Sequence, residues 1–170
     1  MLRRSDIISR ISQPNYKTEK ITYFQNASDI TNQLRRAEKN SRETSKKLAK
    51  HFYTGDPKNT AYRVWRFLRK EIKYQAEPST NQNAKTINRF LNDGFGDCKH
   101  YATTIVGILN QIPGVKSWFT LVGQNKDHKK PNHAYASAMI NGEIITIDPC
   151  RNHFDSEADY FYKWDIQPLK

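Results

Sequence analysis

A cysteine, a histidine and an aspartate stand in an order that suits nucleophilic catalysis. Cys98 opens a strongly apolar segment, His133 stands in Asn-His-Ala-Tyr, and Asp148 stands in Ile-Asp-Pro. A thiolate can attack a carbonyl carbon, an imidazole can move the protons, and a carboxylate can hold the imidazole in one tautomer. If these three side chains meet in space, they form an acyl-transfer site.

The segment that begins at Cys98 is expected to be a helix. From Asp97 to Gln111, apolar residues recur at helical spacing on one side. Asp97 is a good N-cap, which makes Cys98 the first helical residue. The positive end of the helix dipole favours the thiolate there, and a nearby imidazolium would favour it further.

The partners of Cys98 fall on a predicted hairpin. Residues 116–123 and 132–140 are rich in aromatic, β-branched or alternating apolar residues, and residues 143–147 form a third strand pattern. Asn141-Gly142 is a strong two-residue hairpin turn. His133 then lies near the start of one arm and Asp148 at the end of the other. The spacing predicts that the two side chains are in contact.

These motifs resemble those of the transglutaminase-like superfamily of cysteine enzymes. The resemblance rests on Gly96-Asp97-Cys98, His133-Ala134-Tyr135, Ile147-Asp148-Pro149 and, upstream, Ile72-Lys73-Tyr74, and it covers roughly residues 55 to 155. It implies that Cys98 is the nucleophile, His133 the general base and acid, and Asp148 the orienting carboxylate. Tyr135 stands where the family often has tryptophan, and no accessory domain that would indicate the substrate is recognisable.

Acyl transfer also needs donors for the developing oxyanion, and a groove for the substrate. The backbone N–H of Cys98 is the natural first donor, and Asn92 or Gln75 are candidates for the second. Asn92-Asp93-Gly94 also fits the end of a helix and a turn. Trp118, Phe119 and Tyr135 are candidates for a substrate groove, with core packing as the alternative.

The charge is distributed unevenly along the chain. The formal net charge is +11, and all of it comes from residues 1–74, which hold 18 Lys or Arg and 7 Asp or Glu. Residues 20–25 could be an extended arm. A sparse apolar stripe predicts a helix from Ser28 to His51, and Gly55-Asp56-Pro57 breaks the chain before a further amphipathic helix. We therefore expect a basic N-terminal arm and helix over residues 1–53 and a catalytic domain over residues 54–170.

The basic residues of the N-terminal helix allow two interpretations. They can form a solvated face or a docking surface for a protein partner, or they can bind nucleic acid, anionic lipid or another polyanion. The former is favoured, because Glu38 and Glu43 supply helical partners for some of the cations and no nucleic-acid motif is present. The residues of this basic patch are Arg35, Arg36, Lys39, Arg42, Lys46 and Lys47.

No metal site or cofactor is expected. Cys98, His100, Cys150 and His153 have ligand types suited to zinc, but the spacing of Cys98 and His100 is atypical and places them on different helix faces. No apolar run is long enough to span a membrane, and no signal peptide is evident. Two cysteines without a disulfide framework favour a reducing compartment, so a cytoplasmic or virus-particle location is expected.

The sequence thus predicts an α+β, transglutaminase-like (papain-like) domain in which a central cysteine-bearing helix packs on a small antiparallel sheet. The expected reaction is attack on an amide or ester carbonyl of a peptide or protein, followed by transfer to water or an amine, with hydrolysis favoured over crosslinking. The alternative is an inactive fold of the same type that serves as a structural or adaptor module, for instance in a virus or phage particle, and attaches through the basic helix.

Overall fold

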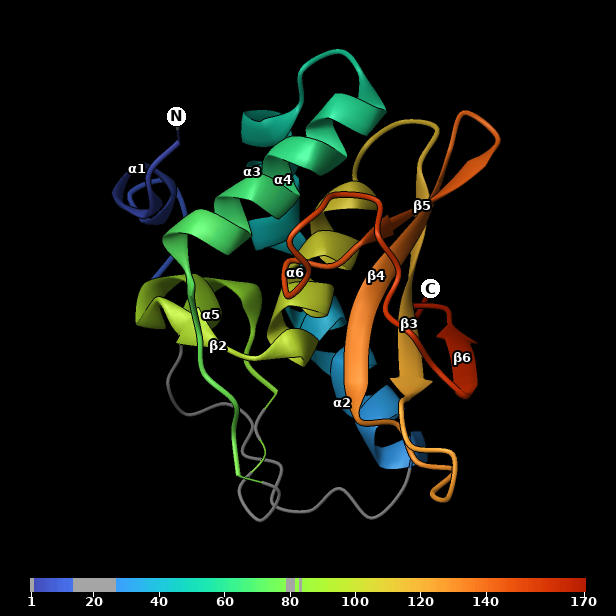
Figure 1. Cartoon of the computed structure of the whole chain (residues 1–170). Helices are drawn as coiled ribbons and strands as arrows, with labels where there is room; N and C mark the ends of the chain where they lie inside the picture. The colour runs from blue at the N-terminus through green and yellow to red at the C-terminus, as the bar shows by residue number, and fades with distance from the viewer. Residues whose placement is uncertain (1, 14–26, 79–81, 83) are drawn as a thin grey trace.

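The computed structural model of the chain describes residues 2–13, 27–78, 82 and 84–170 (Figure 1). The arm suggested for residues 20–25 lies outside them. The helices are α1 (Arg4–Ile8), α2 (Ala27–Asn40), α3 (Arg42–Phe52), α4 (Pro57–Glu71), α5 (Ile87–Asp93) and α6 (Cys98–Leu109). The strands are β1 (Lys73–Tyr74), β2 (Phe95–Gly96), β3 (Lys116–Gly123), β4 (His133–Ile140), β5 (Glu143–Ile147) and β6 (Tyr162–Ile166).

Four strands form an antiparallel sheet in the order β5-β4-β3-β6, and the helices gather on one side of it. Figure 1 shows α6 at the centre of the molecule, against the sheet, and α6 also contacts α2, α3 and α4. A separate parallel pair joins β1, which follows α4, to β2, which leads into α6. The expected α+β arrangement, a cysteine-bearing helix on a small antiparallel sheet, is confirmed.

The predicted hairpin is present and sets the ends of two strands side by side. Asn141 and Gly142 have φ angles of 54° and 86°, the left-handed values that this type of two-residue turn requires. The register runs from Ile140 opposite Glu143 to Ala136 opposite Ile147. Asp148, which follows Ile147, therefore lies beside the N-terminal end of β4, the end that begins with His133.

Small residues let α6 approach its neighbours closely. Ala134, Ala136 and Ala138 alternate along β4 and join the core that contains the apolar face of α6. On α6 itself, a Cβ atom added to Gly107 would lie 2.6 Å from Ser45 Oγ and 2.8 Å from Ile87 Cδ1. The position of the central helix is thus fixed on one side by β4 and on the other by α3 and α5.

The predicted helix from Ser28 to His51 is two helices, because the chain turns at Ser41. Ser41 Oγ donates to the Ala37 carbonyl at 2.6 Å and accepts from the Ile87 N–H at 2.9 Å. The prediction of one continuous helix was wrong. The Ser41 hydroxyl bonds to the first residue of α5 and to a carbonyl of α2, and such side-chain hydrogen bonds compete with continuation of a helix. Leu34 and Leu48, from the two helices, are each 1% exposed and share one core with α6.

Two residues of the predicted basic patch contact the C-terminal segment. Arg35 Nε donates to the Gln167 carbonyl at 2.7 Å, and Arg42 Nη2 donates to the Leu169 carbonyl. The other four patch residues, Arg36, Lys39, Lys46 and Lys47, are exposed. A polyanion or protein partner for these side chains stays a prediction, as does the division of the chain at residue 54.

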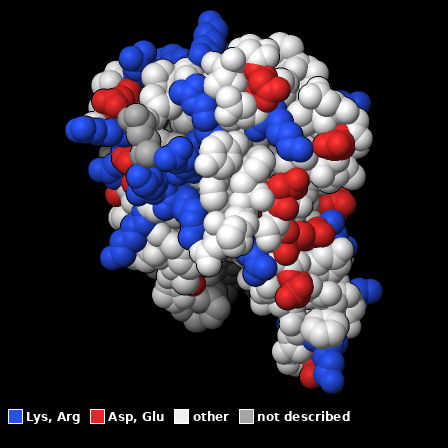
Figure 2. All heavy atoms as spheres, turned by 45° about the horizontal axis from the view of Figure 1, so that its top comes forward, with Lys and Arg blue, Asp and Glu red and all other residues white. Residues whose placement is uncertain are grey.

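Positive charge is also concentrated outside α2 and α3. Figure 2 shows Lys and Arg side chains gathered on the left part of one face and Asp and Glu side chains on the right part. Arg63, Arg66 and Lys70 of α4 line a hollow together with Leu2.

No helix within the described ranges combines the length and the apolar character that crossing a bilayer requires.

Candidate active site

Cys98 lies at the first position of α6 and is partly exposed at a cavity of about 320 Å³. Asp97 is the N-cap, as the sequence predicts. The N–H groups in the first turn of a helix have no acceptor within the helix, so they are available to an anion at this end. The cavity brings Cys98 together with Gln82 and Lys99 on one side and with Asn132 and His133 on the other.

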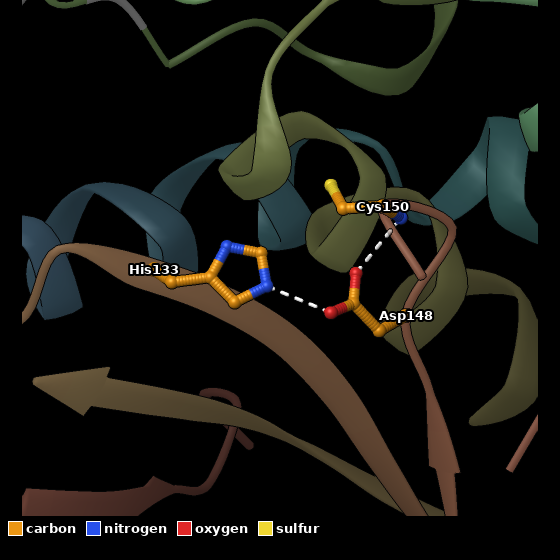
Figure 3. Close-up of side chains that lie close together, drawn as sticks. All are labelled: His133, Asp148 and Cys150. Carbon is orange, nitrogen blue, oxygen red and sulfur yellow. Dashed lines mark hydrogen bonds and ion pairs between the residues drawn. The ribbon is translucent and has the colours of Figure 1, made fainter. Parts of the chain in front are cut away.

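His133 and Asp148 form the predicted pair. His133 Nε2 lies 2.7 Å from Asp148 Oδ2, and the carboxylate is almost completely buried (Figure 3). The second oxygen, Asp148 Oδ1, accepts the backbone N–H of Cys150 at 2.9 Å. Because both oxygens are engaged, the carboxylate can turn only by breaking a hydrogen bond. The pair is therefore fixed in one orientation by the hairpin register and by the turn after β5.

The pKa of His133 reflects its contacts with Asp148 and Cys98. Burial alone lowers the pKa of the ring, because it disfavours the charged form. Hydrogen bonds to Asp148 and Cys98, and the negative charges of both groups, outweigh burial and raise the pKa to about 10. The ring is therefore a cation at neutral pH. An imidazolium beside a cysteine is the arrangement that activates a thiol nucleophile.

A buried polar network holds the start of α6. Burial raises the pKa of Asp97, but its hydrogen bond to His100 and its ion pair with Lys99 lower it to about 2. Lys99 Nζ also lies 2.9 Å from Glu77 Oε2 and 3.0 Å from Gln82 Oε1. Lys99 thereby ties Glu77 and Gln82 to the helix, and Gln82 and Lys99 both line the cavity.

Helix α4 supports the turn that carries Asp148, and sequence reasoning missed this role. Trp65 Nε1 donates to the Asp148 carbonyl at 2.9 Å, and Trp65 is buried. Arg69 donates to the carbonyls of Pro149 and Arg151 at 3.1 and 2.7 Å. The sequence predicts only an amphipathic helix in this region, because a contact between residues so far apart in the chain leaves no local pattern.

Replacing Trp65 by Phe is expected to loosen the orienting carboxylate. The change leaves the buried Asp148 carbonyl without its donor, so the free energy of unfolding should fall by about 1–3 kcal/mol. The alkylation rate of Cys98 at pH 6 should fall as well, because Asp148 no longer holds His133 firmly. Urea titration and timed alkylation measure the two effects.

Trp118 provides the matched control for this variant. Its Nε1 atom is buried and has no hydrogen-bond partner among the residues that the structure describes. Trp118→Phe removes the same N–H group without breaking a hydrogen bond, so it should cost less stability and leave the alkylation of Cys98 unchanged. Equal losses in the two variants would contradict a positioning role for Trp65.

The two candidates for the second oxyanion donor lie in different places: Asn92 belongs to α5, and Gln75 lies beside the residues that precede Cys98. Asn92 donates its side-chain amide to the Asn88 carbonyl at 2.8 Å inside α5, which fits the helix-end interpretation rather than a catalytic one. The backbone N–H of Gln75 donates to the Gly96 carbonyl at 2.7 Å, next to the residues that lead into Cys98. Pairing of β1 with β2 creates this proximity. Gln75, which is exposed, is the candidate that we retain.

The proposed groove residues lie inside the protein instead. Trp118 is 8% exposed, and Tyr135 is 1% exposed and donates its hydroxyl to Glu157 Oε1 at 2.6 Å. Phe119 is completely buried. The assignment of these aromatic residues to a groove is therefore corrected to core packing. The apolar side chains that line the Cys98 cavity include Ile30 of α2 and Leu121 of β3, neither of which the sequence singled out.

The zinc set considered from the sequence does not come together around Cys98. His100 is buried, stacks on Phe90 with ring centroids 5.6 Å apart, and contacts Asp97. Burial lowers the pKa of His100 and outweighs the opposing effect of Asp97. Within the described residues, a different group has metal-ligand chemistry at close range, namely His133, Asp148 and Cys150.

Comparisons with known proteins identify the family and the fold of the chain. A family profile described as "Transglutaminase-like domain" matches residues 43–168. A search of functionally curated proteins gives no match. Among solved structures, the chain is similar to a candidate protease from Parabacteroides distasonis, with a TM-score of 0.59 and 15% identity over 73% of the chain. A candidate cysteine protease from Cytophaga hutchinsonii gives a TM-score of 0.43 and 21% identity over 64% of the chain.

The chain spans only part of these two proteins, 26% of the first and 38% of the second. At such low identity, the similarity to the first protein shows the fold alone.

Proposed function

We propose that this chain, which belongs to the family of transglutaminase-like domains, is a cysteine enzyme that hydrolyses amide bonds through a thioester on Cys98. The supporting observation is the placement of His133, whose ring is 2.7 Å from Asp148 and borders the same cavity as Cys98. The raised pKa of His133 depends in part on Cys98, so the two groups are electrostatically coupled.

In the first step, the Cys98 thiolate forms a bond to the carbonyl carbon, and the carbonyl electron pair moves onto oxygen. The backbone N–H of Cys98, at the N-terminal end of α6, stabilises the resulting oxyanion. The Gln75 side chain is the proposed second donor. When the oxyanion collapses, the C–N bond breaks. The His133 imidazolium gives its proton to the departing amine nitrogen, and a thioester remains on Cys98.

In the second step, neutral His133 removes a proton from a water molecule, and the oxygen of that water adds to the thioester carbon. The C–S bond then breaks, the carboxylic acid leaves, and the thiolate faces an imidazolium again. Asp148 keeps its hydrogen bond to His133 Nε2 through both steps and holds the other ring nitrogen available to Cys98 and the reacting groups.

Water is the proposed acceptor because solvent can reach the sulfur, which is partly exposed. Transfer to an amine competes with hydrolysis only if the amine displaces water from the thioester. The cavity combines apolar side chains from Ile30 and Leu121 with polar groups from Asn132 and Lys99. This combination suits a peptide segment or a glutamine side chain, with an apolar stem and an amide at its end.

Acid-quenched mixtures of the protein with a set of glutamine-bearing and backbone-cleavable peptides test this proposal. Intact-mass spectra should show an acyl adduct on Cys98 or, where the second step is fast, a product with a new carboxyl group. Added primary amine should appear in only a minor share of the product. If neither adduct nor product forms with any peptide, the proposal fails; a predominantly amine-linked product would identify a crosslinking enzyme instead.

A further inference from the structure

A second thiol lies beside the His133–Asp148 pair, and the proposed reaction does not use it. Cys150 is exposed and follows Asp148 by two residues. One ligand atom from each of His133, Asp148 and Cys150 lies within 4.8 Å of the other two. Figure 3 shows the His133 ring at one oxygen of the Asp148 carboxylate and the Cys150 backbone N–H at the other.

We propose that His133, Asp148 and Cys150 bind a thiophilic divalent cation, for which zinc is the best match, and that the occupied site is inactive. The binding of the ion stands by itself, whereas its inhibitory effect depends on the function proposed above. An imidazole nitrogen, a carboxylate oxygen and a thiolate are the three ligand types that zinc uses in proteins. Magnesium and calcium prefer oxygen ligands alone, so the thiol selects against them.

The spacing of the ligand atoms is close to what zinc requires. Bonds of about 2.0–2.3 Å in tetrahedral geometry place ligand atoms about 3.3–3.8 Å apart. Without an ion the ligand atoms lie within 4.8 Å of one another, so the widest separation must shorten by about an ångström. His133 Nε2 and Asp148 Oδ2 are 2.7 Å apart and must instead separate by about half an ångström. Rotation of the exposed Cys150 side chain can supply much of this movement. Three protein ligands leave a fourth position for water.

The backbone around these ligands is already held in place. Trp65 fixes the Asp148 carbonyl, and Arg69 fixes the carbonyls of Pro149 and Arg151, on either side of Cys150. Outer contacts of this kind orient metal ligands and increase affinity. The site therefore requires only side-chain adjustment in a turn that α4 supports.

Occupancy would prevent His133 from forming the imidazolium on which the proposed reaction depends. The ion replaces the hydrogen between His133 Nε2 and Asp148 Oδ2, and the Cys150 thiol releases its proton when it coordinates. His133 is then a metal ligand and no longer part of the pair that Asp148 orients. Cys98 keeps its place on α6, but His133 can no longer protonate the leaving amine as the proposed first step requires.

Cobalt(II) binding tests the site without any need for activity. In a Cys98→Ala variant, Cys150 is the remaining cysteine, so a sulfur-to-cobalt absorption band reports coordination by Cys150. We expect a saturable band with one cobalt per chain, competed away by zinc and absent in the Cys98→Ala/Cys150→Ala double variant. A missing band in Cys98→Ala, or an undiminished one in the double variant, would overturn the proposal.

Zinc titration of the chain with both cysteines present tests the inhibitory effect. Micromolar free zinc should inhibit turnover, and a chelator should restore it. Cys150→Ala should keep the basal rate while its inhibition constant for zinc rises at least about tenfold. An unchanged constant would refute the inhibitory role of Cys150. Where no substrate is turned over by either protein, the proposed hydrolysis is what fails, and the cobalt band alone decides the metal site.

Discussion

Cys98→Ala is expected to lose turnover by a factor of at least about 10⁴, because it removes the atom that forms the thioester. The fold should persist, since Cys98 is only partly buried and packs at the edge of the core. The acyl adduct should vanish from the intact-mass spectrum at the same time. Initial rates on the best peptide, together with the adduct mass, measure the effect.

Cys150→Ala is the matched control for this variant, since it also removes a thiol close to His133 and Asp148. Its basal rate should stay within about twofold of the parent protein, because the proposed reaction makes no use of this sulfur. Circular dichroism of both variants establishes that they fold. Retained turnover in Cys98→Ala, or equal losses in the two variants, would exclude Cys98 as the nucleophile.

His133→Ala is expected to slow alkylation of Cys98 by iodoacetamide at pH 6 by about 100-fold, because an ordinary thiol is almost fully protonated there. In the parent protein, the pKa of His133 is raised to about 10. The ring is therefore charged at pH 6 and stabilises a thiolate, and this stabilisation is lost only as the pH rises through about 10. The rate in the parent protein should thus be high from pH 6 upward.

Cys150 is the internal reference in the same samples. Although the residue as a whole is exposed, burial of its thiol group raises the pKa of Cys150, and the charge of Asp148 raises it further. Cys150 should therefore react slowly in both proteins. Peptide mapping after a timed quench separates the two cysteines. If Cys98 reacts only above about pH 8 in both proteins, the fold is a scaffold without an activated thiol, as expected for a structural or adaptor module.

The parts of the site that depend on neighbouring residues in the chain could be predicted from the sequence. Asn141-Gly142 determines the hairpin, the hairpin determines the register, and the register brings His133 to Asp148. Asp97 and the apolar spacing after it determine where α6 begins. In each case, the sequence pattern lies close in the chain to the structural element that it determines.

The parts that depend on distant contacts could not be predicted. The turn at Ser41 arises from a hydrogen bond to Ile87, and the support of Asp148 comes from Trp65. Strand β6 pairs with β3, although its alternating residues are only half-buried and give a weak pattern. Arg35 looked like a free surface cation, but it binds the Gln167 carbonyl near the end of the chain.

Small residues determine how closely α6 packs against its neighbours and so help to position Cys98 relative to His133. Gly107 has no room for a methyl group on the α3 and α5 side, and Ala134, Ala136 and Ala138 line the β4 side. Helix α6, which carries Cys98, thus packs closely against β4 on one side and against α3 and α5 on the other. His133 belongs to β4. Any bulkier residue at these positions would displace sulfur from imidazole, so the alignment needed for proton transfer is encoded in the smallest side chains of the interior.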